Sequence, residues 1–173
     1  MGIKFIGNNT TFVGLRFIIN DLSVDVEYHN FIFTGCSESV LIWNATRGLV
    51  ENCTFIKNMG SPGCLSGLAL SILKDNFTLN NSRFINNTAY GLMENNPSKV
   101  DNGGGAIWTC KAKIDIINST FIGNEAPYGG AIRGFVDIYT AEFYYNVATN
   151  GNGGGIDVTI ESSVGRPRLE FIN

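Results

Sequence analysis

The sequence has little charge, little proline and a single histidine. Charged residues make up 16% of its 173 residues and the net charge is −3. No basic patch stands out, so nucleic acid is not an expected partner. The one histidine, His29, has no partner at metal-ligand spacing, and we expect it at the surface rather than in a metal or catalytic site. No long apolar run follows a basic start within residues 1–30, so neither a secretory signal nor a membrane span is expected there.

Cysteine is also scarce and its spacing is uninformative. Cys36, Cys53, Cys64 and Cys110 lack the C-x-x-C spacing of zinc or redox sites. Three disulfide pairings are possible and the sequence selects none. Buried free thiols are the default interpretation. Asn-x-Ser/Thr sequons begin at Asn8, Asn9, Asn44, Asn52, Asn76, Asn80, Asn86 and Asn118. They are glycosylation candidates only in a eukaryotic secreted protein.

Two short motifs return along the chain. Phe-x-x-Asn begins at Phe5, Phe17, Phe55, Phe84, Phe121 and Phe143, and the segment 31–34 (Phe-Ile-Phe-Thr) is a variant. Gly-Gly-Ala-Ile occupies 104–107 and 129–132, and residues 154–156 repeat it without the alanine. With phenylalanine anchors at 5, 31, 55, 84, 121, 143 and 171, the steps range from 22 to 37 residues. Such recurrence predicts a repeat architecture.

The residues ahead of each phenylalanine alternate between apolar and polar, as in Ile114, Asp115 and Ile116. A period of two predicts a strand, and no segment holds a helical period over a helical length. One strand at a constant phase in every repeat predicts stacked coils that share a core. We therefore predict an all-β, parallel β-helix of about six to seven coils, forming a single domain over residues 1–173. Both ends fall within the repeat, so we expect a segment of a longer solenoid.

The repeated residues have structural roles in such a stack. We expect one buried ring stack and one amide ladder, made respectively of Phe55, Phe84, Phe121 and Phe143, and of Asn58, Asn87, Asn124 and Asn146. The asparagines are expected in left-handed turns, linked from coil to coil by side-chain hydrogen bonds. The paired glycines are expected to take positive φ at a corner.

Phe-x-x-Asn interleaved with Gly-Gly-Ala-Ile resembles the repeat of the polymorphic outer membrane proteins, the chlamydial type of autotransporter adhesin. The resemblance spans essentially the whole chain and is clearest over residues 102–156. It implies a right-handed parallel β-helix passenger, displayed at a surface and binding host or partner molecules. It implies no catalytic residues.

Binding candidates lie at positions that the stack does not need. Trp43, Trp108 and Arg133 align in the repeat. If the isoleucine before each of them faces inward, these three side chains face outward. A tryptophan at such a position either binds a sugar ring or packs beneath a neighbouring loop. The longest step contains a loop insertion at about 88–103, rich in Gly, Asn and Ser. Tyr90 and Lys99 are its contact candidates, with Met93 and Glu94, unless the insertion is simply tolerated.

Catalysis is the alternative function. Asp115 and Asp137 share one position on successive coils, near Lys113 and Arg133, and they are weak candidates for calcium. A pectate-lyase-like lyase or a glycoside hydrolase needs such carboxylates, but the N-T-D, D-D, G-H-G and R-I-K motifs of β-helix pectinases are absent. We therefore expect a non-enzymatic extracellular or cell-surface (outer membrane) segment without a cofactor. It would act in adhesion to a host or cell-surface protein or glycan, or as a rigid spacer, with membrane contact only through parts outside this chain.

Overall fold

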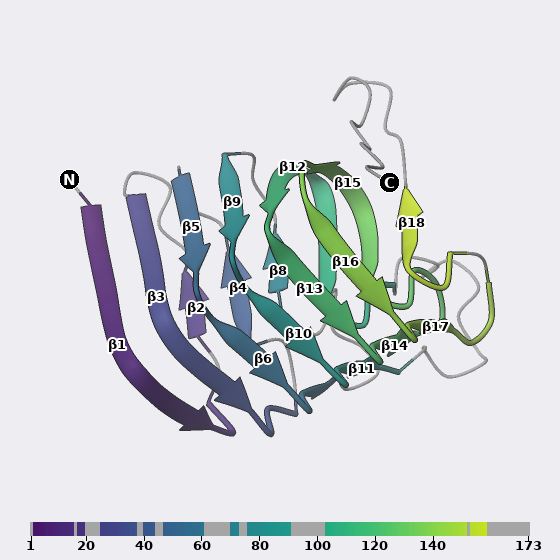
Figure 1. The fold of residues 1–173 in the computed structure, drawn as a ribbon, viewed down its shortest axis with the longest axis horizontal. Helices are drawn as coiled ribbons and strands as arrows, with labels where there is room; N and C mark the ends of the chain where they lie inside the picture. Colours follow the sequence, from purple (N-terminus) through teal and green to yellow (C-terminus); the bar gives the residue numbers. More distant parts are fainter. Residues whose placement is uncertain are drawn as a thin grey trace.

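The computed structural model describes residues 2–15, 17–19, 25–37, 40–43, 47–60, 70–72, 76–90, 103–151 and 153–158. Every regular element in these residues is a β-strand, and each strand pairs in parallel with strands of neighbouring coils. Within the same residues there is no helix of the length and apolarity needed to cross a membrane. The strands stack along one axis in a sheet that does not close on itself (Figure 1). The predicted parallel β-helix is confirmed.

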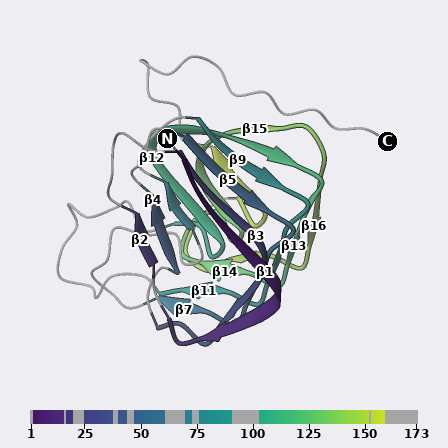
Figure 2. The same ribbon diagram turned by 90° about the vertical axis from the view of Figure 1, so that its left-hand side faces the viewer.

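The chain winds around four faces, seen end-on in Figure 2. The first face holds β1 (Gly2–Val13), β3 (Asp25–Thr34), β5 (Arg47–Glu51), β9 (Phe77–Asn80), β12 (Ile107–Ile117) and β15 (Ile132–Ile138). The second face continues β1 and β3 around a corner and adds β6 (Thr54–Ile56), β10 (Arg83–Ile85), β13 (Ser119–Ile122) and β16 (Ala141–Tyr144). Six strands on each of these faces define six coils.

The third face is a separate four-stranded sheet of very short strands, namely β7 (Met59–Gly60), β11 (Thr88–Ala89), β14 (Glu125–Ala126) and β17 (Val147–Ala148). The fourth face holds β2 (Phe17–Ile19), β4 (Leu41–Trp43), β8 (Leu70–Ile72), the first residues of β12 and β15, and β18 (Ile156–Val158). Phe17 thus lies on a different face from the other motif phenylalanines. Thr88 and Ala89, at the start of the expected insertion, belong to the third face.

A stack of phenylalanine rings runs through the core behind the second face. The ring centroids of successive members are 4.9, 4.8, 5.0 and 4.8 Å apart, for Phe33, Phe55, Phe84, Phe121 and Phe143 in that order. These spacings match the distance between hydrogen-bonded strands, so backbone pairing and ring stacking are satisfied by the same register. The first four rings are fully buried and Phe143 is partly buried.

The register of the first coils differs from the motif-based alignment. Phe33, rather than Phe31, pairs with Phe55, and Phe12 pairs with Phe33. Phe5 instead pairs with Tyr28 on the first face and stacks on its ring at 4.7 Å. Phe31 is buried two residues ahead of the ring stack, where later coils have cysteine, serine or alanine. The choice of Phe5 and Phe31 as anchors was therefore wrong, because an aromatic residue can fill several inward positions of a coil.

An asparagine ladder follows the ring stack by three residues. The Oδ1 atom of Asn124 accepts hydrogen bonds from the backbone N–H and the Nδ2 atom of Asn87, at 3.1 and 2.9 Å. Nδ2 of Asn124 donates to the Phe84 carbonyl at 3.0 Å, and Asn146 repeats both sets of bonds one coil later. Asn58, Asn87 and Asn124 are fully buried. Each amide therefore links adjacent coils without leaving a buried polar atom unpaired.

The left-handed residues lie next to the ladder rather than in it. Positive φ occurs at the residue just before each ladder position, and the occupants are Gly14, Gly35, Lys57, Asn86, Gly123 and Tyr145. A second left-handed row sits at the corner between the first and second faces, at Asn9, Asn30, Asn52, Asn81 and Asn118. The expectation that the ladder asparagines themselves turn the chain was wrong. They stay inside to make hydrogen bonds, and the preceding residue makes the turn.

The glycine pair of the second motif serves two purposes. Gly129 has φ +55°, which glycine adopts without a Cβ clash. Gly130 does not have positive φ, but a Cβ there would lie 2.1 Å from the Gly154 carbonyl oxygen of the next coil. The first glycine therefore permits the turn, and the second permits close stacking of the coils.

Replacing Phe121 with alanine should lower the free energy of unfolding by about 3–5 kcal/mol, because it leaves a cavity between two stacked rings. Chemical denaturation followed by circular dichroism measures the change. Thr120→Ala, an outward-facing change in the same strand, is the control and should cost far less. Equal losses in the two variants would contradict the ring stack.

Replacing Lys57 with glycine should raise the free energy of unfolding by about 1 kcal/mol, because a residue with a side chain pays to adopt a left-handed conformation. The same denaturation experiment measures the gain. Ile56→Gly, one residue earlier and inside β6, should instead destabilise the protein. A destabilising Lys57→Gly would show that the position is not strained.

Candidate functional site

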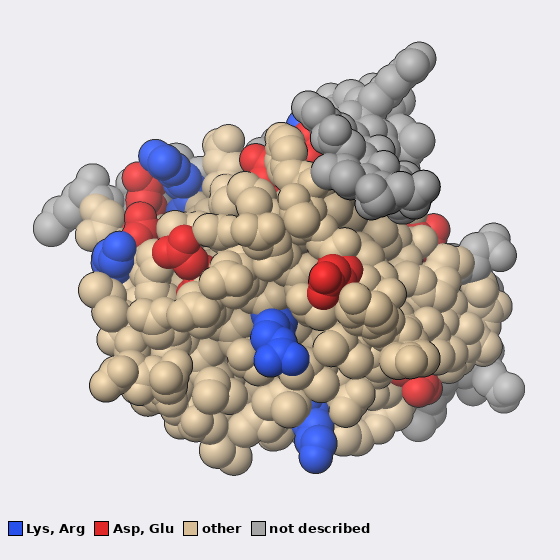
Figure 3. Space-filling view, viewed as in Figure 1, with Lys and Arg blue, Asp and Glu red and all other residues tan. Residues whose placement is uncertain are grey.

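Charged and polar side chains gather on the outside of the first face. Its inward positions hold core residues such as Val26, Tyr28 and Val50, so the alternate positions point outward. We call the outward set the charged surface: Lys4, Asp25, Glu27, His29, Arg47, Glu51, Thr78, Asn80, Lys113, Asp115 and Asp137. Figure 3 shows both signs of charge together over the β1, β3 and β5 end of the solenoid.

His29 lies at the centre of a hydrogen-bonded network on this surface. Its Nε2 atom is 2.9 Å from Oε2 of Glu27 and its Nδ1 atom is 3.0 Å from Oε2 of Glu51. Lys4 contacts Glu27 at 3.2 Å, and Asn80 donates to Glu51 at 2.8 Å. His29 is only 7% exposed, so the expectation of a surface histidine was wrong. Residues far apart in the sequence become neighbours here because strand pairing places His29 opposite Glu51.

The two glutamates of the network approach the histidine ring from both sides. Each ring nitrogen of His29 faces a carboxylate oxygen, Nε2 that of Glu27 and Nδ1 that of Glu51. The hydrogen bond from His29, followed by that from Lys4, lowers the pKa of Glu27 below its usual value. No group of three or more His, Cys, Asp or Glu side chains within the described residues is arranged to hold a metal ion.

Next to this network is an open hollow of about 310 Å³. It is lined by Asp25, Val26, Glu27, Arg47, Gly48, Leu49 and Thr78. Asp25 and Arg47 are paired residues of adjacent strands, yet no ion pair joins these two described side chains. The hollow therefore offers a carboxylate, a guanidinium and a hydroxyl group above an apolar side chain. This arrangement can bind charged or hydrogen-bonding groups of a ligand.

Asp115 and Asp137 occupy paired positions on successive coils of the same surface. Asp137 is 5% exposed and forms an ion pair with Lys113. Burial, with a further contribution from the charge of Asp137, raises the pKa of Asp115, and Lys113 opposes this shift. Asp137 is thus a buried carboxylate paired with Lys113, and the raised pKa makes Asp115 easier to protonate than an ordinary aspartate.

The expected row of exposed aromatic residues is not accessible at Trp108. Trp108 pairs with Arg133, and Arg133 with Asp157, on the fourth face. Trp108 is 4% exposed. Arg133 lies 4.7 Å over the ring centroid of Tyr128 and contacts Asp157 at 3.3 Å. Trp108 is therefore buried and Arg133 is engaged by contacts within the chain.

The motif-based alignment placed Trp43 in this row, but the row contains the residue before it, Ile42. The strand pairing aligns Ile42 with Ser71 and Trp108, whereas Trp43 aligns with Ile72 and Thr109. The error has a local cause: Ser39-Val40 replaces the Gly-Gly pair that marks the position in later coils. The side chain of Trp43 lies outside the described part of the structure.

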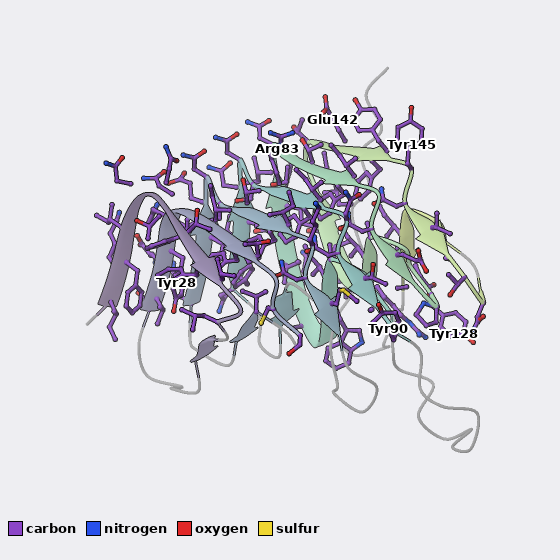
Figure 4. All side chains as sticks on the ribbon, turned by 90° about the horizontal axis from the view of Figure 1, so that it is seen from below. Tyr28, Arg83, Tyr90, Tyr128, Glu142 and Tyr145 are labelled. Carbon is purple, nitrogen blue, oxygen red and sulfur yellow. The ribbon has the colours of Figure 1, made fainter. Side chains whose placement is uncertain are left out.

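The remaining candidates lie near the insertion. Tyr90 is 45% exposed and is labelled in Figure 4, together with Tyr128 on the same side of the solenoid. Lys99, Met93 and Glu94 are outside the described residues. Cys36 and Cys53 are buried free thiols, and burial raises the pKa of Cys53 to about 11. Cys64 and the side chain of Cys110 are also outside the described part.

These features define a class of protein. It is a parallel β-helix with stacked phenylalanine rings and hydrogen-bonded asparagines inside, and with charged and aromatic side chains outside. Residues 81–110 match the family model of the Chlamydia polymorphic membrane protein (Chlamydia_PMP) repeat. The matched segment includes a Phe-x-x-Asn motif, the insertion and a Gly-Gly-Ala-Ile motif, and the predicted family resemblance is confirmed by this match. No curated protein matches the chain. No solved structure matches it either.

Replacing His29 with alanine should raise the pKa of Glu27 toward its usual value, because the main hydrogen-bond donor to that carboxylate is lost. A carboxyl titration by NMR measures it. Because the pKa of Glu27 is lowered in the folded protein, its carboxylate stabilises the fold at pH values above its ordinary pKa, near 4.5. This stability is lost as the pH falls through the lowered pKa. His29→Ala should therefore lose less stability than wild type on acidification. An unchanged Glu27 titration would contradict the network.

Replacing Asp115 with asparagine should stabilise the protein at neutral pH by less than about 1 kcal/mol, because it removes a repulsion between adjacent coils. Because the pKa of Asp115 is raised in the folded protein, protonation of this carboxylate in acid stabilises the folded wild type. This stability is lost as the pH rises through the raised pKa. The gain of the variant should therefore shrink at low pH in thermal melts. A calcium-dependent rise in melting temperature that Asp115→Asn abolishes would instead place a cation between the carboxylates.

Proposed function

We propose that this chain is a rigid segment of a surface-displayed protein that binds a partner through its outward side chains and catalyses no reaction. The partner is a host or cell-surface protein or glycan. Display at a cell surface, including an outer membrane, is supported by the family of the matched repeat, whose name describes a membrane protein. Autotransporter-like passengers are solenoids of this kind.

One observation carries the proposal: the inward polar side chains already have structural partners. The ladder amides and the hydroxyl groups of Ser82 and Ser119 bond to neighbouring coils. The groups left for a ligand are on the outside. The hollow beside Arg47 and the exposed ring of Tyr90 are two accessible positions that can make new contacts.

A polysaccharide lyase or hydrolase is the second candidate. The raised pKa of Asp115 beside Asp137 is the observation that favours it, since a carboxylic acid next to a carboxylate is the pair that a glycosidase uses. Against it, Asp137 is nearly buried and held by Lys113, so it is poorly placed to reach a substrate.

One experiment separates the two functions. The folded segment is incubated with pectins, alginate and glycosaminoglycans, with and without calcium, and is tested separately for binding to cells and to a glycan array. We expect no turnover, and binding that Arg47→Ala weakens. Lys57→Ala removes an exposed cation away from the charged surface and is the matched control. Turnover that disappears in Asp115→Asn would overturn the proposal, and absence of both turnover and binding would leave only a spacer role.

A further inference from the structure

The outside of the second face differs from the charged surface. Its side chains form two columns, one just before and one just after the stacked phenylalanines. The first column is Thr11, Ile32, Thr54, Arg83, Thr120 and Glu142, and the second is Val13, Thr34, Ile56, Ile85, Ile122 and Tyr144. Arg83 and Glu142 are the only charged residues in these columns. We propose that this face pairs with the same face of a second copy of this chain.

The positions of the two charges carry the inference. Arg83 pairs with Thr120, and Thr120 with Glu142, so the opposite charges lie in one column on either side of a neutral residue. Both side chains are exposed, and neither forms an ion pair with another described residue. In Figure 4 both labelled side chains project from the same outer edge of the solenoid, beside Tyr145.

A two-fold axis through Thr120, parallel to the strands, makes this face complementary to itself. It reverses the order of the coils while keeping each column opposite its own copy. Arg83 then faces Glu142 of the second copy, Glu142 faces the other Arg83, and Thr120 faces Thr120. Such an isologous contact forms each charge pair twice and closes as a dimer.

The same operation matches the apolar column. Ile122 meets Ile122 on the axis, and Ile85 meets Tyr144 on both sides. Tyr144 and Tyr145, 46% and 87% exposed, lie at the border of the contact and can cover it. Aromatic side chains with a polar end are frequent energetic centres of protein interfaces. Burial of this column supplies attraction, and the charge pairs set the register.

Other arrangements of two such faces lose the charge match. A two-fold axis along the solenoid would keep the coils in order and exchange the columns, placing Arg83 opposite Ile85 and Glu142 opposite Tyr144. A contact that kept both the coil order and the columns would need a mirror operation, which a chain of L-residues cannot make. The charges therefore select one relative orientation and, with Thr120 at the centre, one register.

The size of the contact predicts weak association. Three coils at roughly 4.8 Å per strand span about 14 Å along the solenoid. A contact of this length covers much less area than a standard interface, which buries ~1,600 Å² in total. Dimers should thus form at high protein concentration, and copies held together at one surface should pair more readily than free ones. This contact is independent of the proposed binding through the charged surface.

Sedimentation equilibrium on the purified chain, from about 10 µM to about 1 mM, tests the pairing. We expect a concentration-dependent dimer that Arg83→Glu and Glu142→Arg each weaken about tenfold, because each change opposes like charges twice. The double variant, which exchanges the two charges, should restore wild-type dimerisation. Lys57→Glu and Glu125→Arg make the same changes of charge outside the contact and should leave it unaffected. Circular dichroism verifies the fold of every variant.

Three outcomes would overturn the proposal. A wild-type chain that stays monomeric at the highest concentration excludes the dimer. A double variant as weak as the single ones, or controls that weaken association equally, would show a general effect of charge rather than a register. A monomer whose binding to cells or glycans responds to Arg83→Glu would show that the face serves a different partner.

Discussion

The structure depends on keeping each coil in register with the next, and the buried asparagine amides impose this most strictly. A backbone ladder alone tolerates a slip of two residues, because the same side chains would still face inward. An amide such as that of Asn124 does not, since a slip would leave its donors and acceptors unpaired in a dry interior. The stacked rings beside it strengthen the same register. The outward columns, including the charged surface, are consequences of this constraint.

The parts of the fold that repeat were predictable from the sequence. Phe55, Phe84, Phe121 and Phe143 stack, and the asparagine three residues after each one joins the ladder, because identical environments on successive coils demand identical residues. Phe31 was a misleading anchor because, in the second coil, an aromatic residue also fills the inward position that Cys53, Ser82 and Ser119 fill later. Where the motif weakens, strand pairing decides the alignment, and pairing is not visible in the sequence.

The candidate site was much less predictable. The alternation around Glu27 indicates a strand, but it does not reveal that Glu51, one coil later, approaches the same histidine. A single histidine without nearby ligands looked like a solvated residue, and it became buried only through neighbours 22 residues away. The row of Trp108 and Arg133 was located correctly for those two residues. Its accessibility was not: Trp108 is buried, and Arg133 contacts Tyr128 and Asp157, its own neighbour in the row on the next coil.

The unequal repeat lengths have one main structural origin. The stretch from the first face to the third is constant in length in successive coils, as from Phe77 to Ala89, Ile114 to Ala126 and Val136 to Ala148. Most of the variation in length falls between the third and fourth faces, after residues such as Tyr90. Smaller differences occur within β1 and between the two ends of β12 and β15. Foreign peptides inserted at that corner would leave the stacked rings and amides untouched. The solenoid therefore has a built-in grafting side, on which new segments can be carried while the opposite faces keep their spacing.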